Sequence, residues 1–240
     1  MTKNTFDRIY ETLKDRILKG AYSIKMRLPI EDDLIKEFDT SRYAVRKAIK
    51  QLADEGLVYS VKGRGVVLLE HTPQTQQFNL SLGQLSGIKA MNADRQLDYR
   101  TDVVSFKQVI VDADLSERTA FEIGIPVYAI QRVRLFNGHR NVIDINYFNA
   151  QLVPGITADI ARQSIYHYIQ DDLHVKIAVV KRMLRVDSVR KTDLKYLELG
   201  DNNCVGNMIS IAFNDTGRQF EYTESHFIPN EFVFTQLIRN

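Results

Sequence analysis

Residues 40–52 read TSRYAVRKAIKQL, and their spacing predicts a helix with one apolar side and one basic side. The apolar residues recur at intervals of three, one and three, on one helical stripe: Val45, Ala48, Ile49 and Leu52. The basic residues fall outside that stripe: Arg42, Arg46, Lys47 and Lys50. Ser41 directly precedes it. Because a serine hydroxyl can accept a hydrogen bond from an amide of the first turn, we expect Ser41 to be the N-cap.

Two further helices and a hairpin are predicted around this segment. Apolar periodicity predicts helices at 5–18 and 31–38, and the basic helix is expected at 41–54. Residues 58–61 and 66–69 indicate two strands on either side of a basic, glycine-containing turn. Three helices followed by such a hairpin predict a winged helix-turn-helix. In that fold the third helix presents its N-terminal side chains to base edges in the DNA major groove.

The total charge of the chain does not by itself indicate nucleic-acid binding, because 32 basic and 30 acidic residues leave a net charge of +2. The distribution is more informative, since residues 40–65 contain six basic residues against two acidic ones. A basic helix on its own is more simply explained as a solvated face. Here the N-cap, the supporting second helix and the basic hairpin occur together in register, and this combination favours DNA binding.

Several strings in this region resemble the GntR family of bacterial repressors, over residues 6–69. They are Leu28-Pro29, Glu31, Ser41-Arg42, Val45-Arg46, Ala48, Leu52, Glu55-Gly56-Leu57 and Gly63-x-Gly65. The resemblance implies DNA contacts at the start of the third helix and at the hairpin: Ser41, Arg42, Tyr43, Arg46 and Gly63. The basic pattern adds three more: Lys47, Lys62 and Arg64.

Two positions depart from the pattern of that family. Ile30 stands where the family usually has a serine that caps the second helix, and such a cap contributes about 1 kcal/mol. Ala44 stands where the family often has a threonine, so a hydroxyl that could contact a phosphate or a base is missing. Neither change disturbs the predicted fold, but the operator need not be the common one.

The remainder of the chain predicts a second domain of a different class. Residues 71–77 are polar, rich in glutamine and interrupted by a proline, so we interpret them as a linker between domains at 1–70 and 78–240. Strands are expected at 99–111, 126–136, 140–148, 176–188, 205–213 and 218–226, with helices at 114–123, 157–169 and 192–199. Hairpin connections dominate, so the predicted fold class is α+β, with helices packed against a mainly antiparallel sheet.

A pair of arginines on the predicted strand 126–136 is the main candidate for ligand binding. Strand alternation sends Arg132 and Arg134 to the same face. Two guanidinium groups about 7 Å apart along a strand suit a phosphate or a carboxylate, although a solvated edge with acidic partners would also explain them. Asp144 shares their face if the hairpin loop at Asn137-Gly138 has three residues, and faces away if the loop has two.

Residues 78–240 resemble the UTRA effector-binding domain of the HutC-type branch of GntR regulators, which has a chorismate-lyase-like fold. The strings that carry the resemblance are Gln131-Arg-Val-Arg134, Asp144-x-Asn-Tyr147-Phe148, Val153-Pro154, Ser164-Ile-Tyr166-x-Tyr168-Ile169 and Glu221-Tyr222-Thr-Glu224-Ser225. For members that bind sugar phosphates, the resemblance implies a phosphate held by Ser86, Arg132, Arg134 and Ser164. It implies sugar hydroxyls held by Asp144, Glu221 and Phe227.

Two of these positions have a further interpretation. Tyr166, in the string that contains Ser164, is included in the predicted effector site. Ser164 itself is equally explained as a plain N-cap of the helix that follows it. Phe227 stands where related domains often have an aromatic hydroxyl, so one sugar hydrogen bond is not expected there.

Other classes of function find little support in the sequence. There is no Gly-x-Ser-x-Gly and no His-Glu-x-x-His motif, and the five histidines are dispersed, so no metal or cofactor is expected. A single cysteine, Cys204, excludes an intrachain disulfide. Since the chain also lacks an apolar leader or a run of membrane length, we expect a cytoplasmic protein.

The sequence therefore predicts a homodimeric repressor that binds a palindromic DNA operator and is released by a small-molecule effector. A sugar phosphate such as trehalose 6-phosphate is the expected effector. Three alternatives remain: a chorismate-lyase-like enzyme fused to a DNA-binding domain, a regulator that responds to a non-sugar anion, and a constitutive architectural DNA-binding protein. The last does not explain why most of the chain forms a separate domain with paired arginines.

Overall fold

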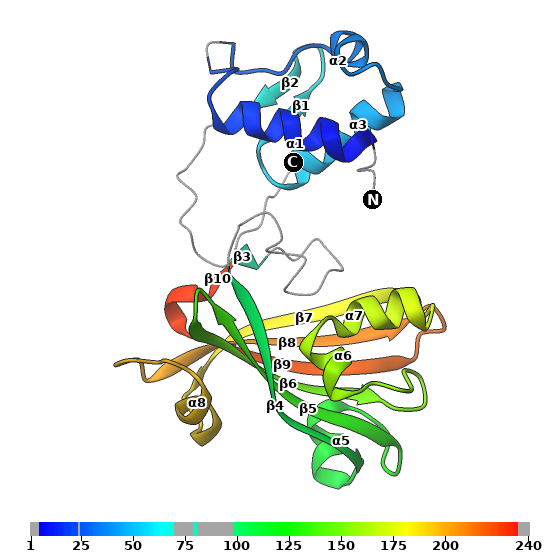
Figure 1. Ribbon diagram of the computed structural model, residues 1–240, viewed down its shortest axis with the longest axis vertical. Coiled ribbons are helices and arrows are strands. Elements are labelled where there is room, and N and C mark those ends of the chain that lie inside the picture. The colour runs from blue at the N-terminus through cyan, green and yellow to red at the C-terminus, as the bar shows by residue number, and fades with distance from the viewer. Residues whose placement is uncertain (1–4, 24, 70–78, 81–97, 235–240) are drawn as a thin grey trace. The chain divides into compact units, whose positions relative to one another are not determined.

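The computed structural model describes residues 5–23, 25–69, 79–80 and 98–234. The chain divides into two compact units, one within residues 1–76 and one within residues 77–235 (Figure 1). The expected linker at 71–77 and the candidate effector residue Ser86 lie outside the described residues.

Three helices and a two-stranded hairpin make up the N-terminal unit, as the sequence predicts. They are α1 (Thr5–Leu18), α2 (Glu31–Phe38), α3 (Arg42–Asp54), β1 (Val58–Val61) and β2 (Gly65–Leu68). The apolar stripes of the three helices meet in one core, where Leu13, Leu34 and Leu52 are fully buried. Burial of these stripes leaves the basic side of α3 exposed.

The turn between α2 and α3 is fixed by local backbone chemistry. Asp39 adopts a left-handed conformation, with a φ of 47°, and ends α2. The Ser41 hydroxyl then caps α3 by accepting a hydrogen bond from the Ala44 amide at 3.3 Å, which confirms the predicted N-cap. Ile30 occupies the N-cap position of α2 and makes no side-chain hydrogen bond there. The sequence predicts this lack of a cap.

A six-stranded antiparallel sheet forms the body of the C-terminal unit, in the order β4-β5-β6-β9-β8-β7 (Figure 1). Its strands are β4 (Tyr99–Ile110), β5 (Pro126–Phe136), β6 (His139–Asn149), β7 (Ile177–Ser188), β8 (Cys204–Asn214) and β9 (Gln219–Phe227). Each strand begins and ends close to its predicted bounds, and the α+β class is confirmed.

Helices cover both faces of this sheet. They are α5 (Ala113–Thr119), α6 (Ala158–Arg162), α7 (Ile165–His167), the π-helical turn η2 (Tyr168–Asp172) and α8 (Lys191–Tyr196). Helices α6 and α7 pack on the face that carries Ile130 and Phe148. Helix α5 and the segment that follows α8 pack near Val127 and Val133. Because Ile130 and Val133 are an odd number of residues apart on β5, these are opposite faces.

A short parallel pairing, which the sequence did not predict, joins the two ends of the C-terminal unit. Strand β3 (Asn79–Leu80) pairs with β10 (Val233–Phe234), and Val233 lies opposite Asn79. A 3-10 turn, η3 (Pro229–Glu231), connects β9 to β10.

A β-bulge in the β5–β6 hairpin sets which side chains share a face. The loop has two residues, 137–138, with φ values of 51° and 82°. Asn141 is an extra residue in β6, since the register shifts by one next to Arg134. Beyond the bulge, Asp144 lies opposite Arg132. Asp144 therefore shares the face of the arginines although the loop has two residues. Loop length alone predicts the opposite face for Asp144, and the bulge reverses that prediction.

Candidate functional site

Two exposed arginines of α3 are held by acidic residues of α2. The Arg42 guanidinium contacts Glu31 Oε2 at 3.3 Å and Asp32 Oδ1 at 2.5 Å, and Arg46 Nε contacts the same Glu31 oxygen at 2.9 Å. Because these ion pairs are exposed, each contributes about 0–1 kcal/mol and can be exchanged for a phosphate contact. Both arginines lie on the side of α3 that does not enter the core.

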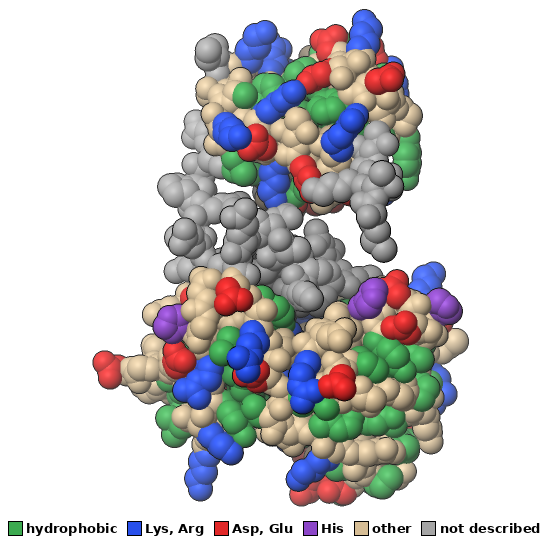
Figure 2. Space-filling view, in the orientation of Figure 1, with side chains coloured by type: hydrophobic (Ala, Val, Ile, Leu, Met, Phe, Trp, Pro, Cys, Tyr) green, Lys and Arg blue, Asp and Glu red, His purple; other side chains and the backbone are tan. Residues whose placement is uncertain are grey.

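The other residues predicted to contact DNA lie in different environments. Tyr43 is 76% exposed. Lys47 Nζ lies 3.8 Å from the centroid of the Phe6 ring of α1, so this ammonium makes a cation–π contact with the neighbouring helix. The hairpin turn exposes Lys62, Gly63 and Arg64. Figure 2 shows basic and acidic side chains interspersed on the face of this unit that is turned to the viewer.

In the C-terminal unit, Arg132 and Arg134 are buried against the carboxylate of Asp144. The arginines are 6% and 7% exposed, and Asp144 is 1% exposed. Asp144 Oδ2 accepts hydrogen bonds from Arg134 Nε at 2.6 Å and from Arg132 Nη2 at 3.3 Å, while the Ser225 hydroxyl donates to Oδ1 at 2.6 Å. The arginines therefore form a buried pair with a shared counter-ion, and not a solvated edge.

Three further polar residues, for which the sequence predicts no role in the site, extend this arrangement. Arg132 Nε donates to Asn146 Oδ1 at 2.9 Å, and Asn146 Nδ2 donates to Thr223 Oγ1 at 2.8 Å. Arg134 Nη1 donates to the Tyr99 hydroxyl. Strand alternation could have identified Asn146 and Thr223, because each lies two residues from another residue of the site. Tyr99 had no such signal, since the pairing of β4 with β5 cannot be deduced from either strand alone.

Glu221 and Tyr166 complete the site on the side of the helices. The Tyr166 hydroxyl donates to Glu221 Oε2 at 2.6 Å, and the Thr223 hydroxyl donates to Oε1 at 2.6 Å. Burial raises the pKa of Glu221 above its ordinary value, and the hydrogen bonds offset only part of that effect. Arg132 Nη1 donates to the Ala161 carbonyl of α6 at 3.4 Å. We refer to the whole set as the guanidinium cluster: Tyr99, Arg132, Arg134, Asp144, Asn146, Tyr166, Glu221, Thr223 and Ser225.

The guanidinium cluster has an excess of positive charge whenever Glu221 is protonated. Burial alone would raise the pKa of Asp144, but the Arg134 and Arg132 guanidinium groups outweigh burial and hold that pKa below its usual value. Burial and the adjacent Arg134 lower the pKa of Arg132 to about 10, so Arg132 is still charged at neutral pH. Two guanidinium groups therefore share one firmly ionised carboxylate, and while Glu221 is protonated one positive charge remains for an external anion.

Two of the predicted effector residues have structural roles in the surroundings of the cluster. Ser164 caps α7 by accepting a hydrogen bond from the His167 amide at 3.3 Å, in agreement with the N-cap interpretation. Phe227 is fully buried in an apolar cluster that also contains Phe136 and Met208. Phe227 therefore supplies apolar support next to the site and no hydrogen-bonding group.

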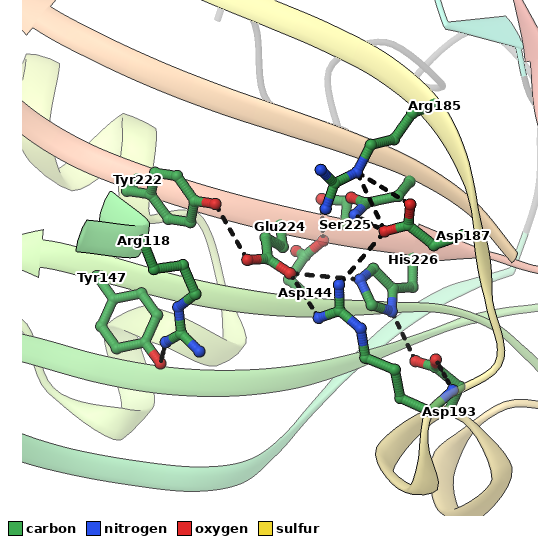
Figure 3. Close-up of polar contacts among 12 residues, drawn as sticks. Arg118, Asp144, Tyr147, Arg185, Asp187, Asp193, Tyr222, Glu224, Ser225 and His226 are labelled. Carbon is green, nitrogen blue, oxygen red and sulfur yellow. Dashed lines mark hydrogen bonds and ion pairs between the residues drawn. The ribbon is translucent and has the colours of Figure 1, made fainter. Parts of the chain in front are cut away.

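Strand β9 carries a second charged network on the opposite face of the sheet (Figure 3). Glu224 accepts hydrogen bonds from Tyr222 at 3.0 Å and from Arg190 at 2.9 Å, and His226 contacts Asp193 of α8 at 2.7 Å. These contacts anchor α8 to the sheet. A cavity of about 540 Å³ lies on the same face and is lined in part by Tyr222, Arg190 and Glu224. The sheet separates this cavity from the guanidinium cluster, because successive residues of β9 point to opposite sides.

A winged helix-turn-helix joined to a sheet domain with a buried, charge-imbalanced cluster is the architecture of a DNA-binding transcriptional regulator with a domain of its own for sensing a ligand. The chain belongs to the GntR family, in its HutC-type branch. The model of bacterial regulatory proteins of the gntR family matches residues 5–68, and the model of the UTRA domain matches residues 94–233.

Curated relatives align over nearly the whole chain. The HTH-type transcriptional regulators GmuR and TreR of Bacillus subtilis (strain 168) are each 26% identical to it, over 98% and 100% of this chain and 98% and 99% of their own. The mannosyl-D-glycerate transport/metabolism system repressor MngR of Escherichia coli (strain K12) is 24% identical over 97% of this chain and 95% of its own. All three are named as regulators or repressors.

Solved structures share the fold. The possible transcriptional regulator YydK of Bacillus subtilis superposes with a TM-score of 0.77 at 20% identity, over 98% of this chain and 100% of that chain. The effector binding domain of the Bacillus subtilis trehalose repressor TreR superposes with a TM-score of 0.55 at 23% identity, over 59% of this chain and 98% of that chain. Across the described ranges, no helix combines the length and the apolar character needed to cross a membrane.

Proposed function

We propose that this regulator represses a sugar-utilisation operon and leaves its operator when a sugar phosphate binds at the guanidinium cluster. The observation that carries the proposal is the buried pair Arg132 and Arg134 with a single shared carboxylate, Asp144. A phosphate accepts fork-like hydrogen bonds from guanidinium groups and would balance the excess positive charge. Because the cluster is buried, the attraction between these charges is screened less than it would be in water.

Arg132 connects the anion site to helix α6, so a ligand that binds Arg132 also affects a contact of α6. Its guanidinium donates at once to Asp144, Asn146 and the Ala161 carbonyl of α6. An anion that engages this guanidinium competes with one of these acceptors. A ligand shifts a conformational equilibrium only if it binds the two states unequally, and about 1–3 kcal/mol of coupling is typical. If the contact of Arg132 with α6 is present in one state and lost in the other, the two states bind the ligand with different affinities.

The hydrogen-bonding groups beside the arginines favour a polyhydroxylated body next to the anion. Asn146, Thr223 and the Glu221–Tyr166 pair present both donors and acceptors next to the arginines. The names of the relatives support the same class, since TreR is a trehalose repressor and MngR represses a mannosyl-D-glycerate system. Trehalose 6-phosphate is the first compound to test, followed by a phosphorylated β-glucoside and a glucosamine-type phosphate.

On the DNA side, we assign residues 1–70 to a DNA-binding domain and 78–240 to the effector domain, with 71–77 between them. Two DNA-binding domains of a homodimer contact the half-sites of a palindromic operator through the start of α3 and the hairpin turn. The protein acts in the cytoplasm, where a bacterial operator is located.

Two variants of the full-length chain test this division of roles. Arg134→Ala should keep operator binding and lose release by trehalose 6-phosphate, whereas Arg46→Ala should lose operator binding and keep binding of the effector. A duplex that the wild-type protein selects from a random pool serves as operator, with anisotropy for DNA binding and calorimetry for the sugar phosphate. Loss of DNA binding at low salt in Arg134→Ala would contradict the assignment, and turnover of any compound would favour the enzyme alternative.

A further inference from the structure

Residues 228–234, here called the strap, attach the end of the sheet to the start of the C-terminal unit. The strap follows β9 and ends in β10, whose Val233 pairs with Asn79 of β3. Only residues 70–78 separate Asn79 from Leu69, the last described residue of the N-terminal unit. The strap is therefore bound to the chain directly after its connection to the DNA-binding unit.

The ring of Phe232 holds the strap on the sheet. This ring lies on Gly206 of β8 so closely that a Cβ at Gly206 would be 2.1 Å from it. Glycine is needed at this position because any side chain would occupy the place of the ring. The Phe232 ring also lies 5.5 Å from the ring of Phe227, between centroids. By contrast, β10 and β3 pair over only two residues each, which is too short to be stable by itself.

An apolar cluster connects this ring to the guanidinium cluster. Its members include Tyr99, Phe136, Met208, Phe227 and Phe232. The Tyr99 ring lies 5.3 Å from the Phe136 ring, between centroids, and the Tyr99 hydroxyl accepts the hydrogen bond from Arg134. Arg134 and the strap therefore meet the same apolar cluster, Arg134 through Tyr99 and the strap through Phe232.

We propose that the contact of Phe232 with Gly206 couples ligand binding at Arg134 to the chain that leads to the DNA-binding unit. The inference rests on the proposed function for the nature of the ligand. An anion that draws Arg134 away from Tyr99 removes one of the two hydrogen bonds to the tyrosine hydroxyl and leaves the one from Thr101 Oγ1 at 2.9 Å, so the ring is held less firmly. Because the apolar cluster is close-packed, it responds by changing between two packings, and in the second one Phe232 leaves Gly206. The two-residue pairing then opens and releases Asn79.

A first experiment tests this coupling without any effector. Hydrogen exchange of the full-length protein reports local opening of the strap, with peptides from β5 as an internal reference. Phe232→Ala should accelerate exchange in residues 228–234 by roughly tenfold or more. Arg134→Lys should accelerate it by a smaller factor, with the strap still closed in most molecules, in keeping with the operator binding expected of Arg134→Ala. Phe234→Ala is the matched control, because Phe234 lies two residues further along the strap and has an exposed side chain. Unchanged exchange in the strap of Arg134→Lys, or of Phe232→Ala, would overturn the inference.

A second experiment measures the coupling itself, as the ratio of operator affinities without and with trehalose 6-phosphate. A ratio of about 5 to 150 is expected for the wild type. Phe232→Ala lacks the ring that holds the pairing closed, so without effector it should bind operator as weakly as the effector-bound wild type does, and the ratio falls to about 1. It should still bind the sugar phosphate. Phe234→Ala should keep the ratio. Gly206→Ala should lower it, but should add nothing in the Phe232→Ala background, where the ring is gone.

The outcomes separate this inference from the function on which it rests. A wild-type ratio in Phe232→Ala would overturn the coupling role and leave the sugar-phosphate function intact. If the wild type binds none of the sugar phosphates, the proposed function fails, and the exchange experiment still decides whether Arg134 controls the strap.

Discussion

Arg134 and Asp144 lie 2.6 Å apart, from Nε to Oδ2, on two strands whose two-residue loop would by itself turn them to opposite faces. The bulge at Asn141 brings them together. Its side chain accepts a hydrogen bond from the Phe136 amide at 3.3 Å, and its carbonyl accepts one from the Ile228 amide at 3.0 Å. One extra residue in β6 thus creates the buried ion pair on which the anion site depends.

Replacing Asp144 by Asn should destabilise the protein and make its stability depend on added anion. Two buried guanidinium groups then lose the carboxylate that they share, and removing one partner of a buried pair typically costs about 3–5 kcal/mol. Thermal unfolding in increasing inorganic phosphate should show a larger rise for this variant than for the wild type. Asp102→Asn is the control, because it breaks an exposed pair with Arg100 at 2.8 Å and should cost less than about 1 kcal/mol. An equal phosphate response in wild type and variant would argue against the charge imbalance.

Replacing Glu221 by Gln should remove a loss of stability that the wild type shows as pH rises. Burial raises the folded-state pKa of Glu221 above its unfolded value of about 4.3. Between these two pKa values the folded state binds more protons than the unfolded state, so the free energy of unfolding falls with rising pH. Gln keeps an acceptor for the Tyr166 hydroxyl and does not titrate. Denaturant unfolding from about pH 4 to 8 measures the difference, with the exposed Glu117→Gln as control. Parallel curves for wild type and Glu221→Gln would refute the prediction.

Replacing Glu31 by Gln should raise affinity for non-specific DNA and lower specificity. The Glu31 carboxylate contacts Arg42 at 3.3 Å and Arg46 at 2.9 Å, so it competes with phosphates and also orients both guanidinium groups. Because exposed pairs contribute up to about 1 kcal/mol, the gain should be no more than about fivefold. Anisotropy with the selected operator and a scrambled duplex gives the ratio of affinities. Asp33→Asn makes the same change of charge on an exposed residue of α2, and an equal effect there would show that position does not matter.

Replacing Lys47 by Ala should weaken operator binding much less than replacing Arg46. The Lys47 ammonium lies over the Phe6 ring of α1, whereas the Arg46 guanidinium lies at the exposed side of α3. Such a cation–π contact contributes about 0.5–1 kcal/mol to stability, and an arginine that contacts a base contributes about 1–3 kcal/mol to binding. Urea unfolding and operator titration of both variants measure the two effects. Equal losses of operator affinity would show that Lys47 turns to the DNA.

Features that depend on sequence neighbours could be predicted for this chain. Ser41 precedes an apolar stripe and caps α3. Arg132 and Arg134 are two residues apart on a strand and share a face. Both follow from the repeat of a single helix or strand, so no knowledge of the rest of the fold was needed.

Features that depend on residues far apart in the chain could not be predicted. The bulge at Asn141 is stabilised by hydrogen bonds from other strand ends, and the loop length alone left the face of Asp144 open. Lys47 belongs to the basic side of α3 by its spacing, but its ammonium is satisfied by the ring of Phe6 in another helix. Tyr99 joins the site only because β4 pairs with β5. In each case a tertiary contact decided what the local pattern left undetermined.

Alternate side chains of strand β9 belong to two different networks on the two faces of the sheet. This limits which mutations of the gene keep both networks intact. One set of its residues belongs to the guanidinium cluster: Glu221, Thr223 and Ser225. The alternate set belongs to the network that anchors α8: Tyr222, Glu224 and His226. Insertion or deletion of a single codon within β9 would interchange the two sets and disable both. Descendants of this regulator can therefore acquire a new inducer through point substitutions along β9, but not by lengthening or shortening it.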